Sequence, residues 1–385
     1  MKHFSYLNSA ATIISSYQRQ QPFHVFLKSF FKEHKKYGSK DRKQIAQLCY
    51  QYFRLGNWAK GKPLQDCIAI AQLLCATEAN PLLAAINEEW NRHAAAPLAE
   101  KCRLLQIDIE ALQLFPMLTG LSNGINASTF NLSHLVQPDV FLRIRPGQQQ
   151  HVENTLKAAG IPYQFKAADC IALPAASKID SLFTIDKEVV VQDLNSQRTR
   201  ELLQLIIPAG KLRVWDCCAA SGGKSLLAWD TLGPIDLTVS DVRPAVLDKL
   251  RLRLSTAGIQ HFHLHTADLT QPVAKQLQQS FDLIIADAPC TGAGTWGRTP
   301  ERLAFFNKKE MDKYERLQQQ IVTHVLPCVK PGGYFLYITC SVFKRENEDI
   351  VTFIENKGGQ LLSMQLFAGY EQKADTLFAA LFVRK

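Results

Sequence analysis

The sequence predicts an α/β fold, in which a helical bundle and a small α/β subdomain precede a parallel β-sheet that is covered by helices on both faces. Three observations support this prediction. After Lys211, short apolar runs alternate with helical segments, a pattern typical of parallel sheets that bind ligands at the carboxyl ends of their strands. Residues 140–191 contain several short apolar runs and one helical segment. The first 126 residues have apolar residues at helical spacing and little strand pattern.

The main sheet is expected to combine parallel strands with an antiparallel hairpin at its edge. The parallel strands are predicted at residues 212–216, 235–240, 261–266, 281–286 and 334–339, and the hairpin at 361–366 and 377–383. The small subdomain is expected to hold strands at 140–144, 163–165, 171–174 and 189–191 and a helix at 149–159. A polar connection is expected at 128–137, and the predicted domains are 1–130, 131–200 and 201–385.

The composition indicates a folded chain that works in the cytoplasm. With 385 residues it is too long for one ordinary core, and its apolar share of 46% and charged share of 21% argue against disorder. We find no apolar run of membrane-spanning length, so no membrane association is expected. The ten cysteines include no Cys-x-x-Cys pair, which argues against a zinc site, and a disulfide framework is not expected in a chain without a secretory signal. The net charge of +9 suits a polyanionic partner.

Two groups of polar residues have a structural and a functional interpretation. The stretch 28–43 carries seven Lys or Arg residues and is either a solvated helix face or a phosphate-contacting surface. Its Ser39 and Asp41 can cap the helix that begins there, and Asn195 or Ser196 can cap the helix that runs to residue 206. In the small subdomain, Arg143, Arg145 and Lys166 are compatible with an RNA contact or with a spacer. The alternating histidines 261, 263 and 265 predict an exposed strand face rather than a metal site.

Residues 212–229, LRVWDCCAASGGKSLLAW, predict a strand, a loop of small residues and a helix, an arrangement that surrounds a ligand with backbone N–H groups. A P-loop is excluded because Cys218 occupies the place of its first glycine, and the dinucleotide fingerprint Gly-x-Gly-x-x-Gly is absent. Two interpretations stay open. One is the adenosyl-donor loop of a class I (Rossmann-like) methyltransferase, with Asp241 at the end of the second strand for the ribose and Asp268 after the third for the adenine. The other is a tight turn with a structural role.

Two further strand ends each present a cysteine. Asp287-Ala-Pro-Cys290 follows the fourth strand and Thr339-Cys340-Ser341 follows the fifth. Carbon 5 of a pyrimidine is a poor nucleophile until a group adds to carbon 6, and a thiolate is suited to adding and leaving. Because the two strands are expected to be neighbours, the pattern favours two cysteines in one cleft over two unrelated core cysteines.

These motifs resemble the RNA (cytosine-5) methyltransferases of the RsmB or Sun type. The resemblance rests on Asp216-Cys-Cys-Ala-Ala-Ser-Gly-Gly-Lys224, on Asp287-Ala-Pro-Cys-Thr-Gly-Ala-Gly294 with Arg298, Pro300 and Glu301, and on Thr339-Cys-Ser341 with Glu346, Asn347 and Glu348. It is strong in the carboxyl-terminal half. The middle segment resembles the family's small RNA-facing subdomain, and the amino-terminal bundle is weakly similar to its NusB-like RNA-binding domain.

The resemblance implies a methyl transfer from S-adenosylmethionine to a cytosine of RNA, without a metal. Cys340 corresponds to the family's nucleophile, Cys290 to the cysteine that helps release the product, and Asp287 to the acid at the cytosine N3 edge. The cofactor contacts correspond to Cys218, Ala219, Ala220, Ser221, Gly222, Gly223, Lys224, Asp241, Asp268 and Asp287. Ribosomal RNA is the first expected substrate and transfer RNA the second.

The chain departs from the family pattern at three places. Ser221 replaces a usual proline, Gly297 replaces the first of two arginines, and Lys344 with Arg345 replaces a proline and an acid, which adds charge that could contact phosphate. Two rival functions are open. One is a non-catalytic RNA-binding factor in ribosome assembly, and the other is a DNA cytosine methyltransferase, whose Pro-Cys nucleophile Pro289-Cys290 superficially matches.

Overall fold

The computed structural model describes residues 2–208 and 210–385. The chain forms two compact units. The helical unit takes the chain up to Thr119 together with residues 126–137 and 296–307, and the α/β unit takes residues 120–125, 138–295 and 308–385. The expected three-domain division stays a prediction. The structure adds that residues 296–307, which lie far along the chain, belong with the amino-terminal helices.

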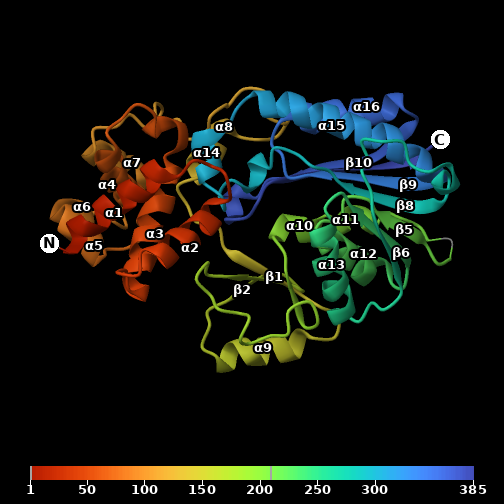
Figure 1. The fold of residues 1–385 in the computed structure, drawn as a ribbon, viewed down its shortest axis with the longest axis horizontal. Helices are drawn as coiled ribbons and strands as arrows, with labels where there is room; N and C mark the ends of the chain where they lie inside the picture. Colours follow the sequence, from red (N-terminus) through yellow and green to blue (C-terminus); the bar gives the residue numbers. More distant parts are fainter. Residues whose placement is uncertain (1, 209) are drawn as a thin grey trace. The chain divides into compact units, whose positions relative to one another are not determined.

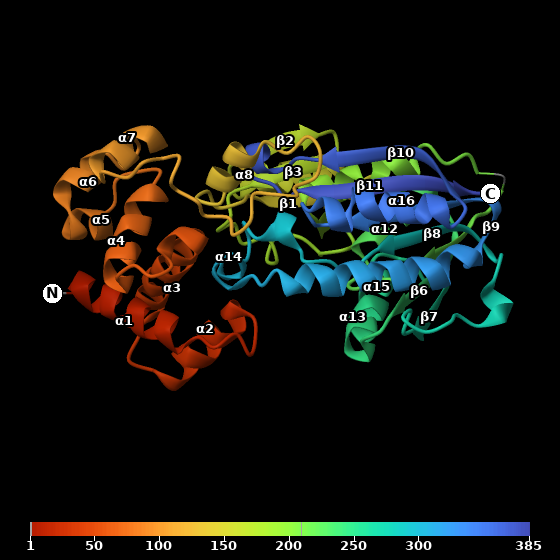
Figure 2. The same ribbon diagram turned by 90° about the horizontal axis from the view of Figure 1, so that it is seen from above.

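The helical unit consists of short and medium helices, as its periodicity predicts (Figure 2). They are α1 (Lys2–Ser16), α2 (Phe23–Glu33), α3 (Ser39–Arg54), η1 (Gly56–Ala59), α4 (Leu64–Leu74), α5 (Pro81–Ile86), α6 (Glu88–Arg92), α7 (Leu98–Leu104), α8 (Ala127–Ser133) and α14 (Glu301–Phe305). Phe23 and Phe53 are fully buried in its core, and the ring of Phe305 from α14 lies 5.8 Å from that of Phe53. At the start of α3, Asp41 accepts a hydrogen bond from the Gly38 N–H at 3.2 Å, as expected for a cap, but Gly38 rather than Ser39 is the N-cap residue.

The polar connection expected at 128–137 is wrong, because most of it is helix α8. Asn126 caps this helix by accepting a hydrogen bond from the Thr129 N–H at 3.0 Å. Inside the helix, the Asn131 side chain is buried and accepts from the backbone N–H groups of Leu114 and Phe115 at 2.9 Å each. The polar composition misled the prediction, because the Asn131 side chain accepts hydrogen bonds from the backbone of a buried loop instead of facing water.

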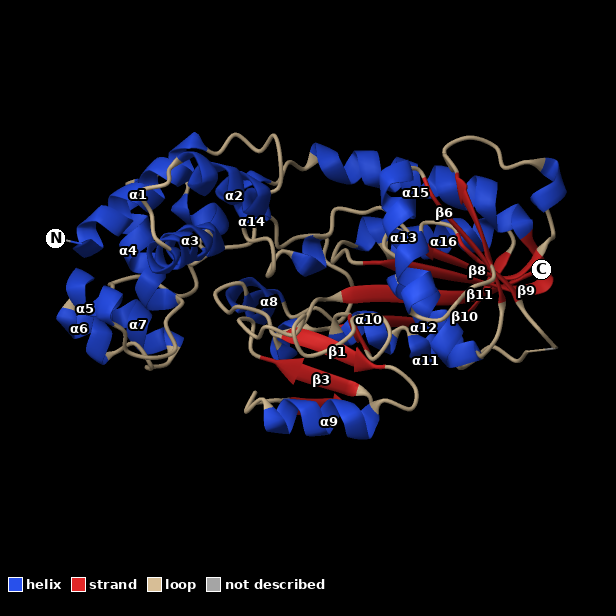
Figure 3. Ribbon diagram, turned by 60° about the horizontal axis from the view of Figure 1, so that its bottom comes forward, coloured by secondary structure: helices blue, strands red, loops and turns tan. Residues whose placement is uncertain are grey.

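A small antiparallel sheet opens the α/β unit, with strand order β2-β3-β1-β4 (Figure 3). Its strands are β1 (Val140–Ile144), β2 (Gln164–Ala167), β3 (Cys170–Leu173) and β4 (Val189–Val191), each close to its predicted place. Helix α9 (Gln149–Ala158) buries Val152 and Leu156 against one face of this sheet.

The main sheet has seven strands in the order β10-β11-β9-β8-β5-β6-β7. They are β5 (Arg213–Asp216), β6 (Asp236–Asp241), β7 (Phe262–Thr266), β8 (Phe281–Asp287), β9 (Val329–Thr339), β10 (Gly359–Phe367) and β11 (Leu377–Arg384). The first five are mutually parallel, and β10 with β11 forms the predicted antiparallel hairpin beside β9. The Rossmann-like fold class is therefore confirmed.

Helices cover both faces of this sheet (Figure 1). One face packs on α11 (Arg200–Leu203), α12 (Gly223–Leu232) and α13 (Pro244–Thr256), which follow α10 (Leu194–Arg198). The other packs on α15 (Lys309–Val325) and α16 (Glu348–Asn356). Short 3-10 turns complete the unit at Lys275–Leu277, Ala293–Thr295, Leu326–Cys328, Lys344–Glu346 and Tyr370–Gln372. Among the described helices, none is both long and apolar enough to span a membrane.

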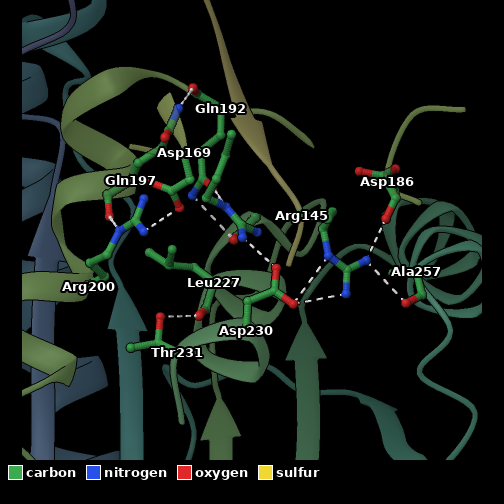
Figure 4. A network of polar contacts seen from close by, with 12 residues as sticks. Arg145, Asp169, Asp186, Gln192, Gln197, Arg200, Leu227, Asp230, Thr231 and Ala257 are labelled. Carbon is green, nitrogen blue, oxygen red and sulfur yellow. Dashed lines mark hydrogen bonds and ion pairs between the residues drawn. The ribbon is translucent and has the colours of Figure 1, made fainter. Parts of the chain in front are cut away.

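A buried ion network joins the small sheet to helix α12. Asp230 of α12 pairs with both Arg143 and Arg145 of the β1 segment, and the Arg145 Nη2–Asp230 Oδ1 distance is 2.9 Å. Figure 4 shows Arg145 reaching Asp230 on one side and the carbonyl groups of Asp186 and Ala257 on the other. Arg143 is 1% exposed. Arg143 and Arg145, two of the three residues considered as RNA contacts, therefore form ion pairs within the α/β unit.

Candidate active site

The loop between β5 and α12 has the strained backbone of a ligand-binding turn. Gly222 has φ of 84°, and a Cβ atom there would lie 2.2 Å from Leu250 Cδ1, so only glycine fits. Ala220 also adopts a left-handed φ of 45°, an unfavourable conformation for alanine. Its N–H donates to Asp241 Oδ2 at 3.1 Å, which ties the loop to the end of β6.

Arg253 of α13 holds the same loop from the other side. Its Nη1 donates to the carbonyl oxygen of Ser221 at 2.9 Å and lies 3.1 Å from the Ser221 hydroxyl. Its Nε pairs with Asp186 at 2.7 Å. The family usually has proline at this position, whose ring restricts the backbone. In this chain, hydrogen bonds from Arg253 hold Ser221 instead.

Asp216, at the end of β5, is completely buried and lines a cavity of about 280 Å³. Ser225 donates a hydrogen bond to its Oδ2 at 2.5 Å, while its Oδ1 has no hydrogen-bond partner among the described residues. Burial raises the pKa of this carboxyl to about 7, although the Ser225 hydrogen bond opposes the shift. A buried acceptor without a partner, on a residue that lines a cavity, is suited to a ligand that brings a hydrogen-bond donor.

The cavity collects residues from four strand ends and from the small subdomain. Of the predicted cofactor contacts, Cys218, Ala219, Ala220, Ser221, Gly223, Lys224 and Asp287 line it, and so does Cys340. Sequence reasoning missed other lining residues, namely Val191, Gln192, Asp193, Ser196, Arg253, Thr295, Asp375 and Leu377. The expected cap at Asn195 or Ser196 is wrong, because Asp193 is the cap and accepts from the Asn195 N–H at 2.9 Å. Ser196 instead receives a hydrogen bond from Lys224 at 2.8 Å inside the site.

The two remaining carboxylates expected at the cofactor are not in the lining of this cavity. Asp241 accepts hydrogen bonds from Ala220 and three from Arg243, so its lone pairs are filled. Burial acts to raise the pKa of Asp241, but these hydrogen bonds outweigh it and the pKa is lowered. Asp268 is exposed and accepts from the backbone and hydroxyl of Thr270, which lower its pKa. A ribose contact at Asp241 would require the Arg243 side chain, which is 60% exposed, to move aside.

The structure brings the two predicted cysteines together. Strands β8 and β9 are parallel neighbours, with Asp287 opposite Ile338, so the loops that follow them lie side by side. The Cys290 Sγ–Cys340 Sγ distance is 3.4 Å, which is a hydrogen-bonded contact between two free thiols and too long for a disulfide. The hydrogen bond to Cys340, together with burial, raises the pKa of Cys290 well above its usual value. The Cys290 thiol therefore holds its proton more firmly than an ordinary cysteine does.

Glu346 is a buried carboxylate that binds both cysteine loops at once. It accepts hydrogen bonds from the N–H of Thr291 at 2.9 Å and the hydroxyl of Thr291 at 2.6 Å, next to Cys290. It also accepts from the hydroxyl of Ser341, next to Cys340. Burial raises its pKa, against these hydrogen bonds. Glu346 thus sets the spacing of the two loops.

Close backbone packing completes this arrangement. The N–H of Gly294 donates to the carbonyl oxygen of Cys340 at 2.8 Å, and a Cβ atom on Gly294 would lie 2.0 Å from the carbonyl oxygen of Thr376. The glycine in the predicted motif therefore allows three chain segments to meet behind the cysteines.

Asp287 lies at the mouth of the cavity and forms an ion pair with Lys224, with an Nζ–Oδ2 distance of 3.0 Å. The Lys224 side chain is only 9% exposed and the Asp287 side chain 34%. Lys224 is thus an internal partner of the acid. Its ammonium group donates to the carboxylate of Asp287 and to the hydroxyl of Ser196.

The remaining departures from the family pattern are at Gly297, Lys344 and Arg345. Arg345 forms ion pairs with two residues of α15, with Asp312 at 2.7 Å and with Glu315, so its charge is paired within the chain. Lys344 is exposed. Gly297 belongs to the helical unit, where its carbonyl oxygen accepts from Arg54 at 3.0 Å. His261 and His263 are exposed and His265 is half-buried. Within residues 2–208 and 210–385, no group of three His, Cys, Asp or Glu side chains is arranged to hold a metal.

Comparison with known proteins places the motifs in a family context. Residues 203–376 match the family described as 16S rRNA methyltransferase RsmB/F. The chain is 32% identical over 233 residues to ribosomal RNA small subunit methyltransferase B of Xanthomonas campestris pv. campestris, covering 56% of this chain and 52% of that protein. It is 26% identical over 223 residues to the probable ribosomal RNA small subunit methyltransferase B of Bacillus subtilis, covering 57% and 49%. The chain spans about half the length of the curated relatives it matches.

Solved structures share the fold. PH0851 matches 98% of this chain and 98% of its own, with a TM-score of 0.70 at 16% identity. NSun6 from Pyrococcus horikoshii with SFG matches 71% of this chain and 99% of its own, with a TM-score of 0.59 at 14% identity. The resemblance expected from the three motifs is confirmed.

Proposed function

Because residues 203–376 match the family described as 16S rRNA methyltransferase RsmB/F, we propose that this protein methylates carbon 5 of a cytosine in RNA, with S-adenosylmethionine as the methyl donor. The observation that carries the proposal is the pair of thiols 3.4 Å apart, one of which opens into the cavity of the glycine loop and Asp287. Ribosomal RNA is the first candidate substrate, since the matched family and relatives are named for it. Transfer RNA is the second.

The cavity residues fit the proposed donor. Gly223 and the small residues 219–221 leave the backbone accessible, and the free Oδ1 of Asp216 can accept a hydrogen bond from an ammonium group. S-Adenosylmethionine supplies, when bound, a methyl group that is activated by its sulfonium charge. Lys224 is neutralised by Asp287, which avoids placing a free cation beside that charge.

In the proposed reaction the chain acts on a cytosine turned out of its stack. The Cys340 thiolate forms a bond to carbon 6, while Asp287 shares a proton with N3 and so keeps the ring from accumulating negative charge. The electron pair thereby made available at carbon 5 forms the bond to the methyl group. Loss of the carbon 5 proton to solvent water then restores the double bond between carbons 5 and 6 and expels Cys340 as a thiolate, while N3 returns its proton to Asp287. Cys290, which holds its proton 3.4 Å away, assists this departure.

The test compares cysteine variants in RNA methylation. Cys340→Ala should abolish transfer of a labelled methyl group, and Cys290→Ala should accumulate a covalent protein–RNA adduct. Cys328→Ala is the matched control, because Cys328 is buried beneath the same sheet and distant from the site in the fold. Free turnover by either active-site variant would overturn these roles.

The same assay separates the rival functions. RNA that contains 5-fluorocytosine should be trapped on Cys340, whereas trapping of DNA on Cys290 would indicate a DNA cytosine methyltransferase. Absence of transfer to any RNA, with RNA binding retained, would indicate a non-catalytic assembly factor. Bisulfite mapping of ribosomal and transfer RNA from cells without this protein would identify the modified cytosine.

A further inference from the structure

The helical unit contains a second polar cavity, of about 400 Å³, which the proposed chemistry does not use. Glutamine side chains dominate its lining: Gln44, Gln47 and Gln51 from α3, and Gln72 from α4. The spacings of three and four residues place the first three along one face of α3. Apolar walls come from Pro81 and Leu82 at the start of α5.

Two of these glutamines are buried and incompletely satisfied. Gln51 is 8% exposed and Gln72 is 1% exposed, and the Oε1 atom of each has no hydrogen-bond partner among the described residues. A buried polar atom without a partner costs about 1–3 kcal/mol, and folded proteins usually supply one. Both side chains line the cavity, but their free oxygens are themselves buried, so each amide must turn toward the cavity to accept from a ligand with hydrogen-bond donors.

The orientation of the Gln72 amide follows from its neighbour. Asn80 caps α5, and its Oδ1 accepts from the Leu83 N–H at 2.9 Å, which fixes that atom as an oxygen. Gln72 must therefore present its NH₂ group to Asn80 Oδ1, at 3.4 Å. Its carbonyl oxygen is left as an acceptor.

The charge around the cavity suits a nucleic acid. The residues of the helical unit include 17 Lys or Arg and 10 Asp or Glu, so most of the net charge of +9 lies there. Lys40 lines the cavity and belongs to the basic stretch 28–43, whose Lys residues are exposed. A phosphate beside a base in the cavity would find Lys40 at its edge, and Glu78 is the carboxylate in the same lining.

We propose that this cavity binds an unstacked base of the RNA substrate that carries an exocyclic amino group. The amino group of adenine, cytosine or guanine would donate to the free oxygens of Gln51 and Gln72, and Pro81 and Leu82 would contact the ring. Uracil has no such group and would leave both acceptors without a partner. The proposal rests on the proposed function for the identity of the ligand as RNA.

The test measures binding of the full chain to single-stranded oligoadenylate and oligouridylate. We expect the wild type to prefer oligoadenylate by about tenfold. The double variant Gln51→Leu with Gln72→Leu should lose this preference and keep its thermal stability, because it removes two unsatisfied buried acceptors. Gln65→Leu, on an exposed position of the same helix α4, is the matched control and should keep the preference.

Two outcomes would overturn the proposal. Equal affinity of the wild type for both oligonucleotides would mean that the cavity holds water alone. An unchanged preference for oligoadenylate in the double variant would mean that residues outside this cavity select the base. If the double variant does not fold, the same conclusion would follow from an unchanged preference in Gln51→Leu. Methyl transfer is measured separately on ribosomal RNA, so a catalytically silent protein that still prefers oligoadenylate would refute the proposed function and leave this proposal standing.

Discussion

Glu346 is the residue whose replacement tests most directly how the two cysteine loops are held. In Glu346→Ala, the N–H of Thr291 and the two hydroxyls that donate to the carboxylate lose their acceptor in a buried place. Each unsatisfied buried donor costs about 1–3 kcal/mol, and the hydroxyls can turn toward each other across their 3.3 Å contact, so we expect a total loss of about 3–5 kcal/mol in unfolding free energy. Glu346→Gln keeps one oxygen for the Thr291 N–H and should lose about 1–2 kcal/mol.

The activity of these variants should follow the spacing of the sulfurs. A misplacement of about 1 Å costs on the order of 100-fold in rate, so Glu346→Ala should form the 5-fluorocytosine adduct about 100-fold more slowly, at a temperature where it is folded. The KM for S-adenosylmethionine should stay within about twofold, because Glu346 is not in the lining of the cavity. Asp349→Asn, exposed in the first turn of α16, is the control.

The adduct rate is measured by rapid mixing and gel separation, and stability by thermal unfolding. A Glu346→Ala protein that forms the adduct within about threefold of the Asp349→Asn rate would refute the idea that this carboxylate positions the thiols. An equal loss in adduct rate and in donor affinity would indicate general disorder of the site instead.

Three further predictions concern the framework of the site. Asp230→Ala leaves two buried arginines without a counter-ion and should destabilise the protein by about 3–5 kcal/mol in denaturant unfolding. Asp236→Ala removes the partner of Arg213 from a pair whose side chains are 39% and 48% exposed and should cost less than about 1 kcal/mol. The folded pKa of Asp216 is raised to about 7, so the stability contributed by its buried, protonated carboxyl is fully present below about pH 4 and is lost as the pH rises through 7. Asp216→Asn should flatten this dependence of the unfolding free energy on pH, by up to about 4 kcal/mol. An unchanged stability profile would contradict the burial argument. Arg253→Ala frees the loop at Ser221 and should raise the KM for S-adenosylmethionine about three- to tenfold in steady-state assays, with little change in kcat; an unchanged KM would mean that the loop is rigid without it.

The order of strands and helices was predictable because it follows from local patterns. The alternation after residue 211 has the periods of buried strands and amphipathic helices, and the observed strands lie close to the predicted places, except that β9 begins at Val329, five residues before its predicted start. Since parallel strands put their carboxyl ends at one edge, Asp216, Asp287, Cys290 and Cys340 could be assigned to one cleft without coordinates. The chemistry proposed for them was inferred from residue type.

Only the tertiary structure decided the details that depend on residues distant in sequence. It gives the 3.4 Å contact between the thiols, and it directs Lys224 to Asp287 and Ser196. It also places Asp241 against Arg243 and leaves Asp268 outside the cavity. Hydrogen bonds and ion pairs act over about 3 Å, so they depend on side-chain positions that packing sets and that no local sequence pattern encodes. The sequence by itself determined which groups reach the site, and packing determined which of them meet.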